Sequence, residues 1–168
     1  MDRSILHRIG AALLLALALP AVSHAQTLHA KLISYEEVPA VSSRGTGRFT
    51  ADINDNRQTI RYELTYQDLE GTVQQAHIHF AQPGVNGGIV VFLCSNLPNP
   101  PTATPACPTP GGTVTGTIAA DNVIGGAAAQ LLSSGEFDEL VTAMRAGLTY
   151  ANVHSSLVPA GEIRGQIR

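Results

Sequence analysis

Apolar and polar residues alternate along this chain with a period of two, and this alternation constrains the fold more than any other feature. It is clearest over residues 60–67, where Ile, Tyr or Leu fills every second position and polar residues lie between them. Successive side chains of an extended strand point to opposite faces, so such a segment has one buried face and one solvated face. Residues 60–66 are therefore predicted to form a half-buried strand of an antiparallel sheet.

The same period, interrupted by turn residues, predicts seven further strands and one helix. The helix is expected over Glu136–Ala146, with acids in its first turn, Gly147 just past its end and its apolar residues on one stripe. We predict an all-β antiparallel sandwich or barrel with one helix inserted before the last two strands. The strands are expected at Leu28–Tyr35, Gly47–Ile53, Ile60–Tyr66, Val73–Phe80, Ile89–Cys94, Thr113–Ala119, Thr149–His154 and Glu162–Ile167.

The first 25 residues are predicted to be a signal peptide. Arg3 and Arg8 precede an apolar run, and Ser23-His24-Ala25 supplies the small residues of a cleavage site. The apolar run is too short to span a bilayer and no cysteine follows it, so we expect neither a transmembrane nor a lipid anchor. Residues 26–168 then form one exported domain, periplasmic or secreted. The formal net charge of −3 argues against a general nucleic-acid binder.

Two cysteines, Cys94 and Cys107, bracket a segment rich in proline and threonine. In an oxidising compartment such a pair is best interpreted as one disulfide, which would close a loop that forms neither helix nor sheet. The alternative makes Cys94 a thiolate ligand of a metal ion beside nearby histidines.

The predicted strand Val73–Phe80 carries two histidines in alternation. His77 and His79 fall on one face, whereas Ile78 and Phe80 lie on the other face and resemble core residues. We therefore expect the imidazoles to point away from the core or toward a shallow cleft. They are either two surface histidines or part of a metal site that would include His154 from a later strand, with copper or zinc as the expected ion.

Two separated motifs resemble the CHRD domain, which is named after chordin and also occurs in exported microbial proteins. The first is Ala76-His77-Ile78-His79 followed by residues 84–90. The second is Tyr150-Ala151-Asn152-Val153-His154 followed by residues 159–166. The resemblance covers about residues 27–168 and implies an immunoglobulin-like or superoxide-dismutase-like sandwich. It places His77, His79 and His154 on the family's histidine positions but supplies no catalytic activity.

A copper-zinc dismutase site is not expected. Beyond the predicted signal peptide, the only histidine other than these three is His29, too few ligands for a two-metal centre. A single ion held by the three histidines, and completed by water or a carboxylate, needs no further histidine.

The final motif, residues 161–166, has two interpretations. Alternation puts Glu162, Arg164 and Gln166 on one face of a strand. Arg164 could form a forked ion pair with Glu63 or Glu37 and lock strands together. Alternatively, these residues could orient a histidine at the metal site.

No nucleophile constellation or phosphate-binding loop accompanies these motifs, so an enzyme is not favoured. We expect an exported CHRD-domain binding or structural module, able to hold one copper or zinc ion and to bind a protein or small ligand. The alternatives are a metal-dependent redox enzyme or periplasmic copper-handling protein, and an extracellular adhesion or matrix module.

Overall fold

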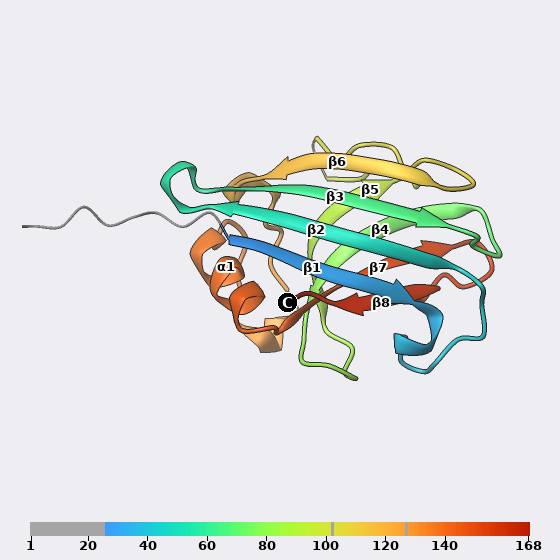
Figure 1. The fold of residues 1–168 in the computed structure, drawn as a ribbon. Helices are drawn as coiled ribbons and strands as arrows, with labels where there is room; N and C mark the ends of the chain where they lie inside the picture. Colours follow the sequence, from blue (N-terminus) through green and yellow to red (C-terminus); the bar gives the residue numbers. More distant parts are fainter. Residues whose placement is uncertain (1–25, 102, 127) are drawn as a thin grey trace, which may run out of the picture.

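A computed structural model describes residues 26–101, 103–126 and 128–168, so the predicted signal peptide lies outside the described residues. Eight strands and one α-helix fill this part of the chain (Figure 1). The bounds of the strands differ from the predicted ones by only a residue or two, and those of β4 coincide, which confirms the all-β prediction. The strands are β1 Gln26–Ile33, β2 Thr46–Asn54, β3 Thr59–Gln67, β4 Val73–Phe80, β5 Gly88–Ser95, β6 Gly112–Ile118, β7 Thr149–Ser155 and β8 Ile163–Gln166.

All eight strands belong to one antiparallel sheet in the order β5-β4-β7-β8-β1-β2-β3-β6. The sheet bends over itself, so that β1, β2, β3 and β6 lie in front of β4, β5 and β7 (Figure 1). At the bend, β8 pairs with β1 only through Arg164 and Ile33. Beyond β8, Arg168 and His29 exchange backbone hydrogen bonds of 2.7 and 2.9 Å that extend this contact.

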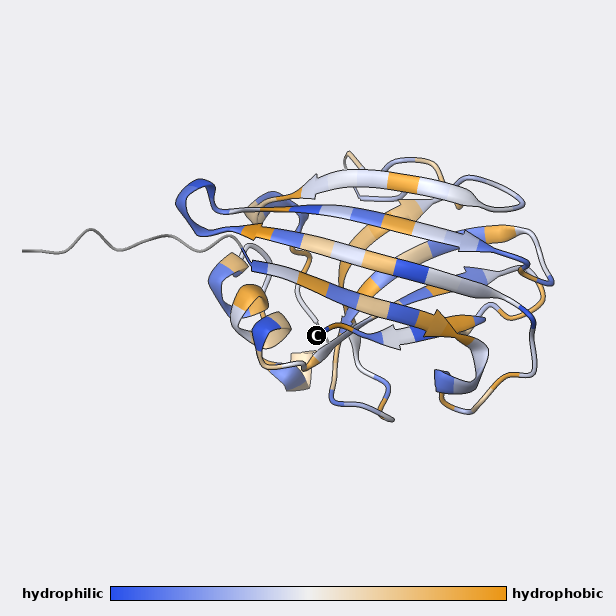
Figure 2. Ribbon diagram, in the orientation of Figure 1, coloured by the Kyte–Doolittle hydropathy of each residue, from blue (hydrophilic) through white to orange (hydrophobic). Residues whose placement is uncertain are grey.

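The end strands β5 and β6 approach each other and nearly close the barrel (Figure 1). A side chain bridges the two layers near this gap, since the Tyr62 hydroxyl on β3 donates to the Leu93 carbonyl on β5 at 2.6 Å. Hydropathy alternates along β2 and β3 as predicted (Figure 2), and the inward residues, including Phe49, Leu64 and Ile78, are fully buried. The apolar interior between the two layers is thus the core that the period of two predicts.

The one α-helix in the described residues, α1, spans Phe137–Arg145 and lies at one end of the barrel (Figure 1). Its stripe of Phe137, Leu140 and Met144 is buried, as its amphipathic pattern predicts. Arg145 pairs with Asp55 at 2.8 Å and so joins α1 to the β2–β3 turn. No helix in the residues described is both long and apolar enough to cross a membrane.

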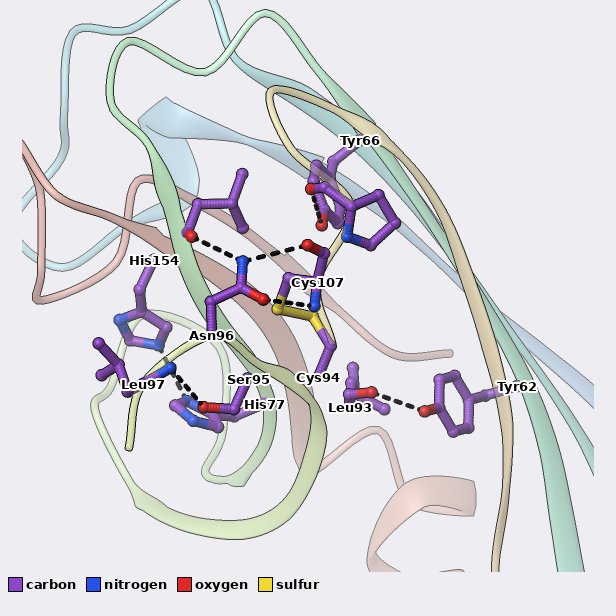
Figure 3. The surroundings of a disulfide bond; sticks show 12 residues. Tyr62, Tyr66, His77, Leu93, Cys94, Ser95, Asn96, Leu97, Cys107 and His154 are labelled. Atoms are coloured by element: carbon purple, nitrogen blue, oxygen red, sulfur yellow. Dashed lines mark hydrogen bonds between the residues drawn. A yellow bond between two sulfur atoms is a disulfide. The ribbon is translucent and has the colours of Figure 1, made fainter. Parts of the chain in front are cut away.

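Cys94 and Cys107 form a disulfide, as the sequence predicts (Figure 3). The Asn96 side chain braces the same loop, because its amide donates to the carbonyls of Val73 and Cys107, each at 3.1 Å, and its oxygen accepts from the Cys107 N–H at 3.0 Å. The bonded Cys94 offers no thiolate, so the alternative of a cysteine metal ligand is wrong.

Candidate metal centre

The sheet brings the three histidines together. His77 and His79 lie on β4, and His154 lies on the adjacent strand β7. The Nδ1 atom of His77 is 3.0 Å from Nε2 of His154, and one ring nitrogen from each of the three histidines lies within 4.8 Å of the others. Two distant sequence motifs therefore meet at one point.

The expected orientation of these histidines toward a surface or shallow cleft is wrong. His77, His79 and His154 are only 0%, 7% and 5% exposed. The face of β4 opposite Ile78 is also covered, because the loops after β4 and β7 fold back over it and contact the imidazoles. A strand period of two defines two faces, but loop packing decides whether the second face is buried.

Two backbone carbonyls fix the tautomers of His79 and His154. His79 Nδ1 lies 2.9 Å from the Gly87 oxygen, and His154 Nδ1 lies 3.0 Å from the Pro159 oxygen. A carbonyl oxygen can only accept, so each Nδ1 carries the proton and each Nε2 presents a lone pair. A histidine that donates its second ring N–H to a backbone carbonyl is typical of a metal ligand.

Two further ring nitrogens of the cluster have no protein partner, and burial keeps all three imidazoles uncharged. The Nε2 atoms of His77 and His79 are buried without a hydrogen bond among the residues described. Burial lowers the pKa of His77 to about 2, and the neighbouring His154 and His79 lower it further in the same direction. Burial also lowers the pKa of His79 to about 4, against the opposing hydrogen bond to Gly87, and it lowers that of His154. All three imidazoles are therefore neutral at neutral pH, as metal ligation requires.

A stack of side chains supports His79 from one side. The Tyr150 ring lies parallel to the His79 ring, with an interplanar angle of 3° and centroids 4.7 Å apart. The Arg164 guanidinium lies over the Tyr150 ring, 3.4 Å from the centre of that ring. Such cation–π contacts are strongest where water is excluded, and Arg164 is only 2% exposed.

Arg164 does not form the predicted forked ion pair with Glu63 or Glu37. Its two Nη atoms instead donate to the Asn86 side chain at 3.1 Å and to the Val85 carbonyl at 2.7 Å. Glu63 is exposed on β3, in the other layer. Arg164 thus holds the loop between β4 and β5, the same loop whose Gly87 carbonyl accepts from His79.

Gly87 occupies a position that no larger residue could fill. A Cβ atom there would lie 1.8 Å from the Phe80 carbonyl oxygen, far inside van der Waals contact. The close approach of the two backbone segments explains the glycine and fixes the Gly87 carbonyl beside His79.

Glu162 lies just before β8, and its buried carboxylate faces loops rather than the histidines. It accepts from the Ser43 hydroxyl and from the Glu70 N–H, both at 2.6 Å, and from the Ser155 hydroxyl. Burial alone would raise the pKa of Glu162, but these hydrogen bonds lower it. Its role is therefore to tie loops to the end of the sheet, and the expectation that it shares the face of Arg164 is wrong.

Two residues beside the cluster, Asn152 and Glu37, have no role at the histidines in the sequence-based prediction, which considers Glu37 only as a partner of Arg164. The Asn152 side-chain oxygen lies 3.0 Å from Nε2 of His154. Alternation along β7 places Tyr150, Asn152 and His154 on one face, so this signal was present in the sequence. Glu37 lies in the loop after β1 and is only 7% exposed. No periodic pattern could have placed it here.

The donor set fits one metal ion. Copper and zinc accept imidazole nitrogen, and zinc–nitrogen bonds are about 2.0–2.1 Å. Two nitrogens on one ion can then be at most about 4.2 Å apart, so the widest pair must move inward by a small rotation of a ring. The buried nitrogen lone pairs give the site affinity for a cation. The burial of the site leaves little access for a larger substrate.

A comparison with protein-family models gives a match to the CHRD domain over residues 28–167. No curated protein and no solved structure matches the chain. The CHRD match is consistent with a binding or structural module, and together with the disulfide it points to an exported or extracellular protein. Because the match spans nearly all of the described residues, the chain belongs to the CHRD domain family.

Proposed function

We propose that this protein is an exported metal-binding module that holds one copper or zinc ion through His77, His79 and His154. One observation carries the proposal: three buried imidazoles converge, and two of them donate their Nδ1 protons to backbone carbonyls. Buried polar atoms normally have partners, and an ion would supply one to the Nε2 atoms that lack it.

Binding rather than catalysis is favoured by the closure of the site. All three ligands are at most 7% exposed, and the loop between β4 and β5 is held over them by Arg164. A small ion can enter through modest side-chain movement, whereas a redox substrate would need the loop to open. This closed geometry therefore favours a metal-storing or structural role over catalysis of a redox reaction.

The test uses the mature chain, residues 26–168, stripped with a chelator and dialysed against Zn²⁺ or Cu²⁺. We expect about one ion per wild-type chain and almost none in the His77→Ala, His79→Ala, His154→Ala triple variant. His29→Ala is the matched control, because His29 is exposed on β1 and should leave the stoichiometry unchanged. Equal metal content in the wild type and the triple variant would refute the proposal.

A further inference from the structure

The proposed site has an unusual balance of charge. Its three ligands are neutral imidazoles, so a bound divalent ion would keep its full charge of +2 in a buried place. Arg164 adds another positive charge nearby, through its stack on Tyr150 and His79. Buried charge is costly unless an opposite charge compensates it, and the three imidazoles supply no anion.

Glu37 is a buried carboxyl group that could compensate this positive charge. One of its oxygens, Oε1, is buried without a well-formed hydrogen bond in the described part of the chain. Burial raises the pKa of Glu37 to about 7, while Arg164 and the Asn152 amide act in the opposite direction. A cation beside this carboxyl would favour its ionised form further.

Asn152 joins Glu37 to the histidines. Its nitrogen and Glu37 Oε1 both lie beside Gly161, and its oxygen lies 3.0 Å from Nε2 of His154. Gly161 packs against both side chains, since a Cβ atom there would lie 2.6 Å from Glu37 Oε1 and 2.8 Å from the Asn152 nitrogen. Gly161 also has a φ of +130°, a conformation that favours glycine. The backbone at Gly161 thus leaves room for the Glu37 and Asn152 side chains.

The other buried glutamate, Glu162, has a set of hydrogen-bond donors that Glu37 lacks. Glu162 accepts hydrogen bonds from two serine hydroxyls and a backbone N–H. Glu37 Oε1 has no such set of donors. A buried polar group without partners calls for an explanation.

We propose that Glu37 is the charge-compensating residue of the metal site, and that its carboxylate, acting through Asn152, makes the site prefer divalent over monovalent cations. This inference rests on the proposed function. Glu37 is a positioning and electrostatic residue in this account, and the three histidines remain the ligands.

The effect of a nearby charge on a bound ion scales with the charge of that ion. Removing a residue that supports metal ligands typically costs 10–100-fold in affinity. We therefore expect Glu37→Gln to weaken Zn²⁺ binding by about 10–100-fold and Ag⁺ binding by only the square root of that factor, about 3–10-fold. Glu37→Asp keeps the charge and should keep most of the preference for Zn²⁺.

The experiment measures the affinities of the mature protein for Zn²⁺ and for Ag⁺ by competition with chelators, in chloride-free buffer near pH 8. Ag⁺ is a usable probe because the described residues contain no free cysteine. Glu63→Gln removes the same charge from the exposed face of β3 and is the matched control. If Glu37→Gln does not fold, Glu37→Met replaces it, because an apolar residue of similar volume is usually tolerated at a buried ionic position.

Each outcome bears on one of the two proposals. A larger loss for Zn²⁺ than for Ag⁺ in Glu37→Gln, with Glu63→Gln unchanged, supports the inference. Equal losses for both ions indicate a merely structural role and overturn it, as do unchanged affinities. A wild-type protein that binds neither ion overturns the proposed function itself, and the inference with it.

Discussion

Glu162 provides the sharpest prediction about stability. Its carboxylate accepts hydrogen bonds from Ser43, Glu70 and Ser155, which belong to three separate segments of the chain. Glu162 itself is completely buried, and the contact with Ser155 is buried as well, so water cannot readily replace that contact. The substitution Glu162→Ala should leave three donors without their acceptor, and one of them, the Ser155 hydroxyl, is fully buried.

The cost can be worked from these contacts. Each hydrogen bond to a charged group contributes about 1.5–3 kcal/mol, and relief of the buried charge offsets part of the sum. We expect Glu162→Ala to lower the free energy of unfolding by about 4 kcal/mol. For a domain of about 140 residues the unfolding entropy is about 0.3 kcal/mol/K, so the melting temperature should fall by about 13 °C.

Thermal unfolding followed by circular dichroism measures this change, and Glu63→Ala, on the exposed face of β3, should melt close to the wild type. The pH dependence adds a second check. The folded-state pKa of Glu162 is lowered, so its contribution is present above the unfolded value of 4.5 and is lost as the pH falls through the folded value. A Glu162→Ala protein that melts within about 3 °C of the wild type at neutral pH would have lost less than about 1 kcal/mol of its free energy of unfolding. That result would contradict the role given to these hydrogen bonds.

Two further predictions concern the loop and the histidines. Replacing both Cys94 and Cys107 by Ala should cost about 3 kcal/mol, because the disulfide closes a loop over a sequence separation of 13 and restricts the unfolded chain; equal urea midpoints would contradict this. Burial lowers the pKa of His77 to about 2 and of His79 to about 4, so the stability of the metal-free protein should be complete above the unfolded value of 6.5. It should fall by about 1.4 kcal/mol for each histidine at pH 5.5, because only the unfolded chain takes up these protons. Burial raises the pKa of Glu37 to about 7, so protonation of Glu37 stabilises the folded protein as the pH falls and opposes the effect of the histidines. Urea unfolding of Glu37→Met at pH 7.5 and 5.5 therefore isolates the contribution of the histidines. An unchanged free energy of unfolding would show that these histidines do not titrate as described.

The sequence predicts the strands well because period-two alternation is a local signal. Strand β4 has the predicted bounds, Val73–Phe80, and helix α1 differs from the prediction by one residue at each end. The disulfide was predictable too, since an exported chain with two cysteines leaves few alternatives. Local pattern and composition were sufficient for these features.

The environment of the histidines was not predictable in the same way. His77 and His79 are buried because loops from distant parts of the sequence cover a face that looks solvent-exposed in the strand pattern. The partners of Arg164 differ from the predicted carboxylates because Asn86 and the Val85 carbonyl lie within its reach. These contacts depend on how loops pack in three dimensions, which no residue spacing encodes.

The most direct test of the metal site is a crystal structure of the mature protein loaded with Zn²⁺ or Cu²⁺, with anomalous data collected at the metal edge. We expect one strong anomalous peak, with one ring nitrogen each from His77, His79 and His154 at about 2.0–2.1 Å from the zinc ion or at a similar distance from copper. A peak bound elsewhere, for example at the exposed His29, or no peak in fully loaded crystals, would contradict it.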